Sequence, residues 1–301
     1  MAASQVQVVE LHVSDLAELR ARVKPDLPRS SGICISALNV IEGRVEGNFY
    51  TDGWPNFTTV VFQCLKPRLS EICDLHCCTT CKQRLLSVLE QAGLVTAGRW
   101  QYLQVVEDGC NKDVTDFLIQ HLRFHGKPLT ANDYSLQENV MCALEAHHPA
   151  TFTECPQGYR IKRLSVEHSK HVLSQLQASQ WNTFGSIGRP SSVVEEYNKH
   201  CFEWLDSSAA FHNSDPTVPV SWQSTHAFSG EIGNLFTLKD HRRKGLASAT
   251  KSAVCKNIVA RGEVPFSTVM VDNSSNIELH YKLGFRYFGR LTELYLHPSI
   301  L

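Results

Sequence analysis

The sequence predicts an α/β (α+β) chain that folds as two domains, and three observations support this prediction. The chain has 301 residues, which is long for one compact domain and ordinary for two. Strand-like and helix-like runs alternate along it. The alternation stops over 146–158, a stretch with two prolines, paired histidines and no periodicity, and then restarts. We therefore expect an N-terminal α/β domain over 1–150 and a C-terminal domain over 157–301.

The first half alternates short strands with helices. Runs rich in β-branched and aromatic residues predict strands, and periodic apolar residues that end near a glycine predict helices. We expect strands over 8–13, 32–41, 57–64 and 100–106, a polar helix that ends at 23, and helices over 81–92 and 114–123. None of these segments carries a phosphate loop or a catalytic motif.

The second half predicts a strand, two helices and then an antiparallel meander. Ser229-Gly230 is a hairpin turn signal between two of its strands. A basic turn follows, and after it a helix that Gly262 and Pro265 stop. The expected strands cover 159–164, 208–212, 218–227, 231–238 and 267–271, with final strands to 296, and the expected helices cover 167–180, 193–204, 246–260 and 275–283.

The composition excludes several classes of protein. With 43% apolar and 20% charged residues, the chain can bury a sizeable core and lacks the signature of disorder. A net charge of −1 gives no overall basic field for nucleic acid or anionic lipid, so any anion site must be local. The sequence shows neither a secretory signal nor a run of apolar residues long enough to span a membrane. We expect a soluble intracellular protein with no membrane span and no nucleic-acid partner.

The eleven cysteines are an odd number in a chain without an export signal, which favours free thiols over disulfides. One cluster, Cys73, His76, Cys77, Cys78 and Cys81, contains residue types that bind zinc. A structural zinc site usually adds a second, distant pair of ligands, which this sequence lacks. We expect thiols packed on a helix and no metal, with a zinc site as the alternative.

The sharpest chemical feature is a basic turn before a helix, Arg242-Arg243-Lys244-Gly245-Leu246-Ala247. A helix N-terminus presents unpaired backbone N–H groups and the positive end of the helix dipole, which together attract anions. Gly245 lets the backbone approach a phosphate without a Cβ, and Ala247 keeps the first helical turn small. The turn therefore fits a pyrophosphate, and the alternative is a solvated loop. It matches neither the Walker loop nor the dinucleotide-binding glycine motif.

These residues resemble a known signature. Arg242-x-x-Gly245-x-Ala247 is similar to the coenzyme A signature of the GNAT superfamily of N-acetyltransferases, and Leu279–Phe285 resembles the closing helix-to-strand element of that superfamily. Within the superfamily the chain most resembles the glycine N-acyltransferases, through Pro219–Trp222, Ser229–Gly245 and Asp52–Phe57. The resemblance spans nearly the whole chain and is strongest over 218–285.

The resemblance implies the GNAT fold, a mixed and mostly antiparallel sheet flanked by helices, with a degenerate GNAT-like N-terminal domain. It implies transfer of an acyl group from acyl-CoA, a co-substrate and not a prosthetic group, to the amino group of glycine or another small amino acid. We expect a monomer, and the resemblance suggests a mitochondrial location. The alternatives are a GNAT enzyme that acts on protein lysine or a polyamine, and a non-catalytic acyl-CoA-binding module.

The resemblance also assigns roles to residues. Glu231 matches the family's proposed catalytic base, and Tyr281 resembles the superfamily's usual proton donor to the departing thiolate, with packing under the coenzyme as its alternative role. His226, near the end of the strand before the hairpin turn, is the alternative base. An amine that is protonated at neutral pH needs such a base before it can attack a thioester. Asn276 is either a helix cap or a pantetheine contact. The expected cofactor-binding residues are Leu235, Phe236, Thr237, Arg242, Arg243, Lys244, Gly245, Leu246, Ala247 and Asn273.

Overall fold

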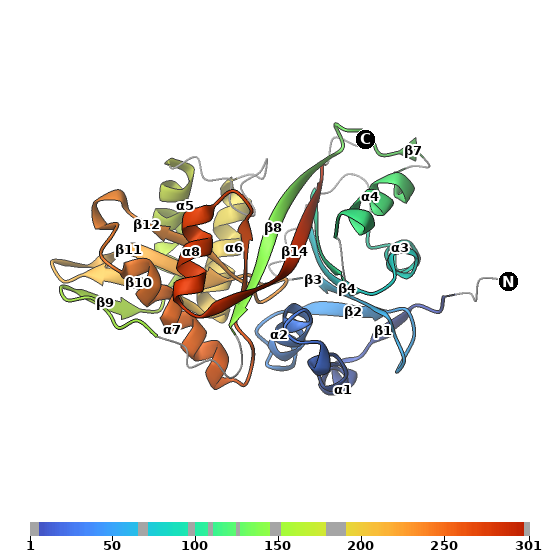
Figure 1. The fold of residues 1–301 in the computed structure, drawn as a ribbon, viewed down its shortest axis with the longest axis horizontal. Coiled ribbons are helices and arrows are strands. Elements are labelled where there is room, and N and C mark those ends of the chain that lie inside the picture. The colour runs from blue at the N-terminus through green and yellow to red at the C-terminus, as the bar shows by residue number, and fades with distance from the viewer. Residues whose placement is uncertain are drawn as a thin grey trace. The chain divides into compact units, whose positions relative to one another are not determined.

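The structure is a computed structural model that describes residues 6–65, 72–95, 100–107, 111–124, 127–144, 152–178 and 191–297. Contacts divide the chain into unit 1, which comprises 1–141, 270–272 and 288–301, and unit 2, which comprises 142–269 and 273–287. The division falls inside two long strands, β8 (Tyr134–Leu144) and β14 (Phe285–Leu296), both labelled in Figure 1. The expected domain ranges, 1–150 and 157–301, stay predictions.

Both units contain one order of elements: a strand, two helices, three strands, a helix, a strand and a helix. In unit 1 these are β1 (Val9–Leu11), α1 (Leu16–Val23), α2 (Ser31–Ile41), β2 (Gly47–Thr51), β3 (Thr59–Cys64), β4 (Ile72–Thr79), α3 (Lys82–Gln91), β5 (Trp100–Glu107) and α4 (Asn111–His121). In unit 2 they are β9 (Tyr159–Lys162), α5 (Ser169–Ala178), α6 (Ser191–Trp204), β10 (Ser207–His212), β11 (Asp215–Thr225), β12 (Ile232–Thr237), α7 (Leu246–Ala260), β13 (Phe266–Met270) and α8 (Ser274–Lys282).

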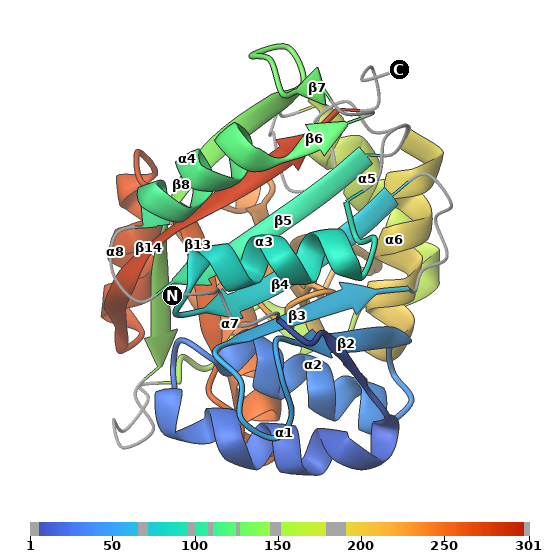
Figure 2. The ribbon, with the colours of Figure 1, turned by 90° about the vertical axis from the view of Figure 1, so that its right-hand side faces the viewer.

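The strands form mixed, mostly antiparallel sheets, as the sequence predicts. The sheet that contains the strands of unit 1 has the order β1-β2-β3-β4-β5-β14-β8-β13, with β4 and β5 parallel and the other registered pairs antiparallel. In unit 2 the four strands β12-β11-β10-β9 are all antiparallel. Helices α3 and α4 cover one face of the unit 1 sheet (Figure 2). Short elements complete the chain: 3₁₀ turns η1 (Val13–Asp15), η2 (Lys24–Asp26), η3 (Val166–His168) and η4 (Lys239–His241), and strands β6 (Arg123–Phe124) and β7 (Lys127–Pro128).

The core of unit 1 follows from the alternation of side chains along its strands. Leu75 and Cys77 in β4 lie on the face that α3 and α4 cover. Both residues are buried in one apolar cluster with side chains from these two helices. His76 lies between them in sequence and so faces the other side, where its Nδ1 is 2.7 Å from Gln104 Oε1. Burial lowers the pKa of His76 to about 4, so its imidazole is neutral in the folded chain.

The strand expected over 32–41 is wrong, because this segment is helix α2. Its β-branched residues suggested a strand. In the structure, residues on nearly every side of the helix are buried, including Ile33, Ile35, Ala37 and even Asn39. A helix surrounded by protein shows no polar face, so a short apolar run does not distinguish it from a strand.

The helix expected to carry the cysteine cluster begins later, at Lys82, and Cys73 to Cys78 lie in strand β4. Cys77 is in the apolar core of unit 1, and Cys78 lies on the opposite face of the strand. Among the described residues, no group of three or more His, Cys, Asp or Glu side chains could hold a metal ion.

Strands β2, β4 and β8 have no counterpart among the expected elements. The expected linker, 146–158, lies partly outside the described residues, as do the last residues of the helix expected over 167–180. Within the described part of the chain, none of the helices has the length and apolar character that crossing a membrane requires.

Candidate active site

Unit 2 contains a cavity of about 560 Å³ bounded by β12, the basic turn, the start of α7 and helix α8. Nine of the ten expected cofactor-binding residues line it, and Lys244 does not. The lining residues are Leu235, Phe236, Thr237, His241, Arg242, Arg243, Gly245, Leu246, Ala247, Ser248, Asn273, Ser275, Asn276, Glu278, Leu279 and Lys282. The turn and strand that the sequence singled out therefore face one space.

A bulge in β12 directs this strand along the cavity. The β11–β12 register pairs Trp222 with Phe236 and Ser224 with Gly233, so two residues of β12 oppose one of β11. Asn234, one of the two, has a φ of 56°, a left-handed conformation that Asn tolerates better than most residues. Beyond the bulge, β12 is not a neighbour of β13 in either sheet, which leaves its outer edge open.

Unit 1 differs at the corresponding pair of strands. There β4 and β5 pair in unbroken parallel register from Ile72 with Trp100 to Thr79 with Glu107. The backbone groups of both strands are used in this ladder, so an extended ligand has no strand edge to bind between them. Among the described residues, only unit 2 combines an open strand edge with a glycine turn at a helix start.

The turn before α7 presents backbone donors that have no side-chain cap among the described residues. Gly245 is the N-cap residue with a φ of 79°, and no side chain caps the helix. The first helical hydrogen bond runs from Ala249 N to Gly245 O at 3.0 Å. The three residues between them, Leu246, Ala247 and Ser248, line the cavity, and their N–H groups belong to the positive end of the helix dipole.

The basic side chains of the turn have different partners. Arg242 Nε donates to Thr237 O at 3.0 Å, and its guanidinium carbon lies 6.0 Å from the centroid of the Phe236 ring. Lys244 Nζ donates to Asp240 O at 3.0 Å and to the hydroxyl of Tyr159 at 3.3 Å, which accounts for its absence from the cavity wall. Arg242 and Arg243 therefore place positive charge at the cavity, and the ammonium group of Lys244 is held outside its lining.

Helix α8 supplies the amide groups of the site. Asn273 is its N-cap and its Oδ1 accepts from Asn276 N at 3.2 Å, so the cap is Asn273 and not Asn276. The Oδ1 atom of Asn276 is buried without a hydrogen-bond partner in the described structure, although this residue lines the cavity. A buried acceptor in this state favours a ligand that donates an N–H.

Glu231 precedes β12 and is 4% exposed. Its Oε1 accepts from Thr268 N at 3.0 Å and from the Thr268 hydroxyl, so the carboxylate links β12 to β13. It is absent from the residues that line the cavity. The structure therefore gives Glu231 a definite structural contact, and the role of base stays a prediction.

The other expected proton carriers lie in different surroundings. His226 is 4% exposed, and its Nδ1 is 3.3 Å from the hydroxyl of Tyr197, which also accepts from Ala227 N at 3.0 Å. A Cβ at Gly233 would come within 2.2 Å of His226 Nε2, so the ring is packed against β12. Tyr281 is 46% exposed on α8 and does not line the cavity.

Sequence reasoning missed a buried lysine in this unit. Lys251, on α7, has no exposed surface, and its Nζ donates to Ser267 Oγ at 3.3 Å and lies 4.8 Å from the Phe285 ring centroid. Ser267 in turn donates to Ile232 O at 2.6 Å, next to Glu231 in the chain. The signal was the helical spacing of Lys251 with Val254, Cys255 and Ile258, which places the lysine on the buried stripe of α7.

Burial lowers the pKa of Lys251 to about 8, against the smaller opposing effects of Cys255, Cys142 and Glu231. Burial and the charge of Lys251 also hold the pKa of His280 well below its usual range. The His280 Nδ1–H donates to Asn276 O at 2.7 Å, so the ring is neutral and fixed. A cationic lysine near neutral imidazole and thiols is costly to bury.

This cost predicts a pH dependence of stability. The pKa of Lys251 is 10.5 unfolded and about 8 folded, so between these values the unfolded chain holds one proton more and the free energy of unfolding rises with pH. Lys251→Met should remove that rise and should raise the free energy of unfolding at pH 7 by about 3 kcal/mol, from 1.36 kcal/mol per pKa unit. Urea unfolding at pH 7 and pH 10 measures both effects.

Lys256→Met is the matched control, because Lys256 is exposed on the same helix. It should leave the pH dependence as it is in the wild-type chain. If Lys251→Met lowers the free energy of unfolding at pH 7 and keeps the wild-type rise, the buried charge is stabilising and this account of it is wrong.

Comparisons with known proteins agree with this architecture. A protein from Drosophila superposes with a TM-score of 0.73 at 17% identity, covering 98% of this chain and 100% of that chain. A tandem GNAT protein from the clavulanic acid biosynthesis pathway has a TM-score of 0.53 at 11% identity, covering 97% and 98%. A GCN5-related N-acetyltransferase-like protein from Streptococcus suis has a TM-score of 0.51 at 15% identity, covering 95% and 100%.

The sequence comparisons are more local. A family model described as FR47-like protein matches residues 211–295, which contain the basic turn and both helices of the cavity. The comparison with curated proteins finds no significant match. The solved structures show the GNAT fold, and the family model identifies residues 211–295 as similar to the FR47-like protein family.

Proposed function

We propose that this chain is an acyl-CoA-dependent N-acyltransferase whose acceptor is the amino group of glycine or another small amino acid. The observation that carries the proposal is the 560 Å³ cavity at the uncapped start of α7, in a chain with the GNAT fold. In this proposal the catalytic domain covers 157–301, and 1–150 is a degenerate GNAT-like domain.

In this proposal the cavity holds the pyrophosphate and the pantetheine arm of acyl-CoA. The pyrophosphate accepts hydrogen bonds from the N–H groups of Leu246, Ala247 and Ser248, and Arg243 adds positive charge. The pantetheine arm lies along the open edge of β12, where backbone groups of Leu235 to Thr237 pair with its amides. Asn276 Oδ1, which has no partner in the described structure, accepts one amide N–H.

The reaction then needs three proton transfers. Glu231 takes a proton from the acceptor's ammonium, and the resulting amine attacks the thioester carbonyl carbon. The C–S bond breaks, the nitrogen loses a second proton to solvent as the amide forms, and coenzyme A leaves as a thiolate that takes up a proton. Tyr281 is the proposed donor of that proton.

The identity of the acceptor rests on the resemblance of the sequence to the glycine N-acyltransferases, as does a mitochondrial location. A pocket for glycine excludes larger amino acids by size, because it leaves no room for a Cβ substituent. The acceptor's carboxylate also needs a cationic or amide-rich contact outside the phosphate turn.

A screen of the twenty amino acids tests the proposal. Release of free thiol from benzoyl-CoA and phenylacetyl-CoA should be fast with one or two small amino acids, glycine first and glutamine second, and slow without an acceptor. A lysine peptide is the comparison acceptor. Strong activity on the peptide would make the chain a protein or polyamine acetyltransferase, and binding of acyl-CoA without turnover would make it a non-catalytic module; either result contradicts the proposal.

A further inference from the structure

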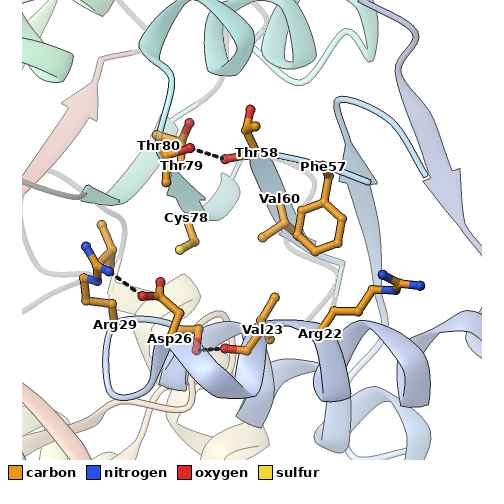
Figure 3. A pocket seen from close by; sticks show the side chains of 12 residues that line it. Arg22, Val23, Asp26, Arg29, Phe57, Thr58, Val60, Cys78, Thr79 and Thr80 are labelled. Atoms are coloured by element: carbon orange, nitrogen blue, oxygen red, sulfur yellow. Dashed lines mark hydrogen bonds and ion pairs between the residues drawn. The ribbon is translucent and has the colours of Figure 1, made fainter. Parts of the chain in front are cut away.

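Two ion pairs of unit 1 show how a protein compensates a charge that is shielded from water. At a cavity of about 250 Å³, Arg29 forms an ion pair with Asp26, and both side chains remain partly exposed (Figure 3). The Asp52 side chain has no exposed surface, and Arg84 donates to it at 2.9 Å. Each of these charges has an opposite charge in direct contact, which offsets the free-energy cost of removing an ion from water.

Lys251 in unit 2 is fully buried and has no such partner. Its side chain has no exposed surface and forms no ion pair with any described residue. Of its three N–H donors, one reaches an acceptor in the described structure, Ser267 Oγ at 3.3 Å, and the ring of Phe285 adds a cation–π contact. These contacts offset only part of the cost of burying an ammonium group.

Strand β13 connects Lys251 to the proposed base. Ser267 accepts from Lys251 and donates to Ile232 O at 2.6 Å. The next residue, Thr268, donates from its backbone N–H to Glu231 Oε1 at 3.0 Å, and its hydroxyl donates to the same atom. Adjacent residues of a strand face opposite sides, so the ammonium and the carboxylate approach β13 from its two sides, with no ion pair between them.

The groups that surround Lys251 include one anion. Cys255 lies on the same helix, Cys142 in β8 and His280 in α8, and burial is the main reason that all three are uncharged; it raises the pKa of the Cys255 thiol to about 12. Glu231 is the other group that acts on the charge of Lys251, and it raises the pKa of this lysine. The ammonium and the Glu231 carboxylate therefore stabilise each other across β13.

Stability alone does not account for a lysine at this position. A methionine of similar length would fill the same space without the cost of a buried charge, which is why we expect Lys251→Met to be more stable. Residues that lower stability in this way are expected where a function needs them. The function that fits this geometry is a fixed positive charge behind the carboxylate of Glu231.

We propose that Lys251 is a positioning residue for the acyl transfer: its fixed ammonium stabilises the negative charge of Glu231, so that this carboxylate is ready to accept a proton from the acceptor's ammonium. This inference rests on the proposed function, in which Glu231 is the base. Lys251 has no exposed surface and does not line the cavity, so it acts through Glu231 and not by contact with acyl-CoA.

The pKa of Lys251 tests the coupling of the two charges without any turnover. The stabilisation between two charges is reciprocal, so its effect on the lysine also measures its effect on the carboxylate. Glu231→Gln should lower the pKa of Lys251 further, from about 8. NMR titration of the lysine ε-methylene signals in the full chain measures this shift, and Lys251→Met identifies the signal. Glu263→Gln, at a second buried carboxylate of unit 2, should leave the pKa unchanged.

The pH dependence of turnover tests the consequence for the reaction. At pH 6 the wild-type lysine is charged, so Lys251→Met should lower kcat/KM for the acceptor by roughly threefold to tenfold. At pH 9 the wild-type lysine has lost most of its own proton, so the two chains should have similar rates. KM for acyl-CoA should not change. Because this variant is expected to be more stable than the wild-type chain, unfolding does not explain a lower rate.

Lys256→Met is the matched control, since it removes an exposed lysine from the same helix, and its rates should follow the wild-type chain at both pH values. The proposal is overturned if Glu231→Gln leaves the pKa of Lys251 unchanged, if Lys251→Met is as active as Lys256→Met at pH 6, or if its loss is equal at pH 6 and pH 9, as a purely structural effect would be. A wild-type chain that acylates no amino acid contradicts the proposed function and this inference with it, whereas the three results above, in an active chain, overturn this inference alone.

Discussion

A Gly245→Glu variant should lose acyl-CoA binding, with its affinity for acetyl-CoA lowered by at least about 100-fold, or about 2.7 kcal/mol. Gly245 stands at the uncapped start of α7 with a φ of 79°, so a side chain there is strained and enters the phosphate site. The added carboxylate would accept from the N–H groups that the pyrophosphate needs and would repel its charge. Calorimetry with acetyl-CoA measures the loss.

Gly262→Glu is the control for this variant. Gly262 follows the other end of α7, also has a positive φ, of 75°, and has no atom within 4 Å of an added Cβ. Both variants carry a similar backbone strain and the same new charge, and only Gly245→Glu places that charge at the cavity. If Gly245→Glu binds acetyl-CoA within a few-fold of Gly262→Glu, the phosphate site lies elsewhere.

Glu231→Gln should lower turnover by roughly 10²-fold or more at pH 7, the usual scale for loss of a general base, with acyl-CoA affinity nearly unchanged. The glutamine oxygen can still accept from Thr268, as Glu231 Oε1 does at 3.0 Å from the backbone N, so the contact between β12 and β13 is retained. Activity should return in part at high pH, where the acceptor amine loses its proton to solvent. Initial rates at pH 7 and pH 9.5 measure both effects.

Glu263→Gln is the control for Glu231→Gln, because Glu263 is a second carboxylate of unit 2 that is only 7% exposed and lies outside the cavity. Its turnover should stay close to that of the wild-type chain. An unchanged rate for Glu231→Gln at pH 7 would remove Glu231 from the mechanism and would make His226 the next residue to replace.

Sequence reasoning singled out the basic turn because the features that mark it are local in sequence. A glycine, a helix start and adjacent cations are all visible in a short run of residues, and nine of the ten expected cofactor residues line one cavity. The positive φ of that glycine is seen only in the structure. The strands and helices of the C-terminal half could be predicted for the same reason, since the signals that bound them are local. Helix α7 begins and ends where it was expected.

The features that were missed depend on contacts distant in sequence. Whether 32–41 is a helix or a strand is decided by the protein that surrounds it on all sides. The link from Glu231 to Thr268 and that from Lys251 to Ser267 each join different elements of unit 2. Lys244 belongs to the basic turn in sequence, but Asp240 and Tyr159 hold its side chain away from the cavity.

Amide hydrogen exchange with and without acetyl-CoA tests the central claim most directly, namely that acyl-CoA binds in unit 2 along β12 and at the start of α7. The account predicts slower exchange in residues 235–249 and 273–279 when acetyl-CoA is present, and no change in β4 and β5, whose backbone groups are already paired. Slower exchange confined to unit 1, or no change in 235–249 at saturating acetyl-CoA, would contradict it.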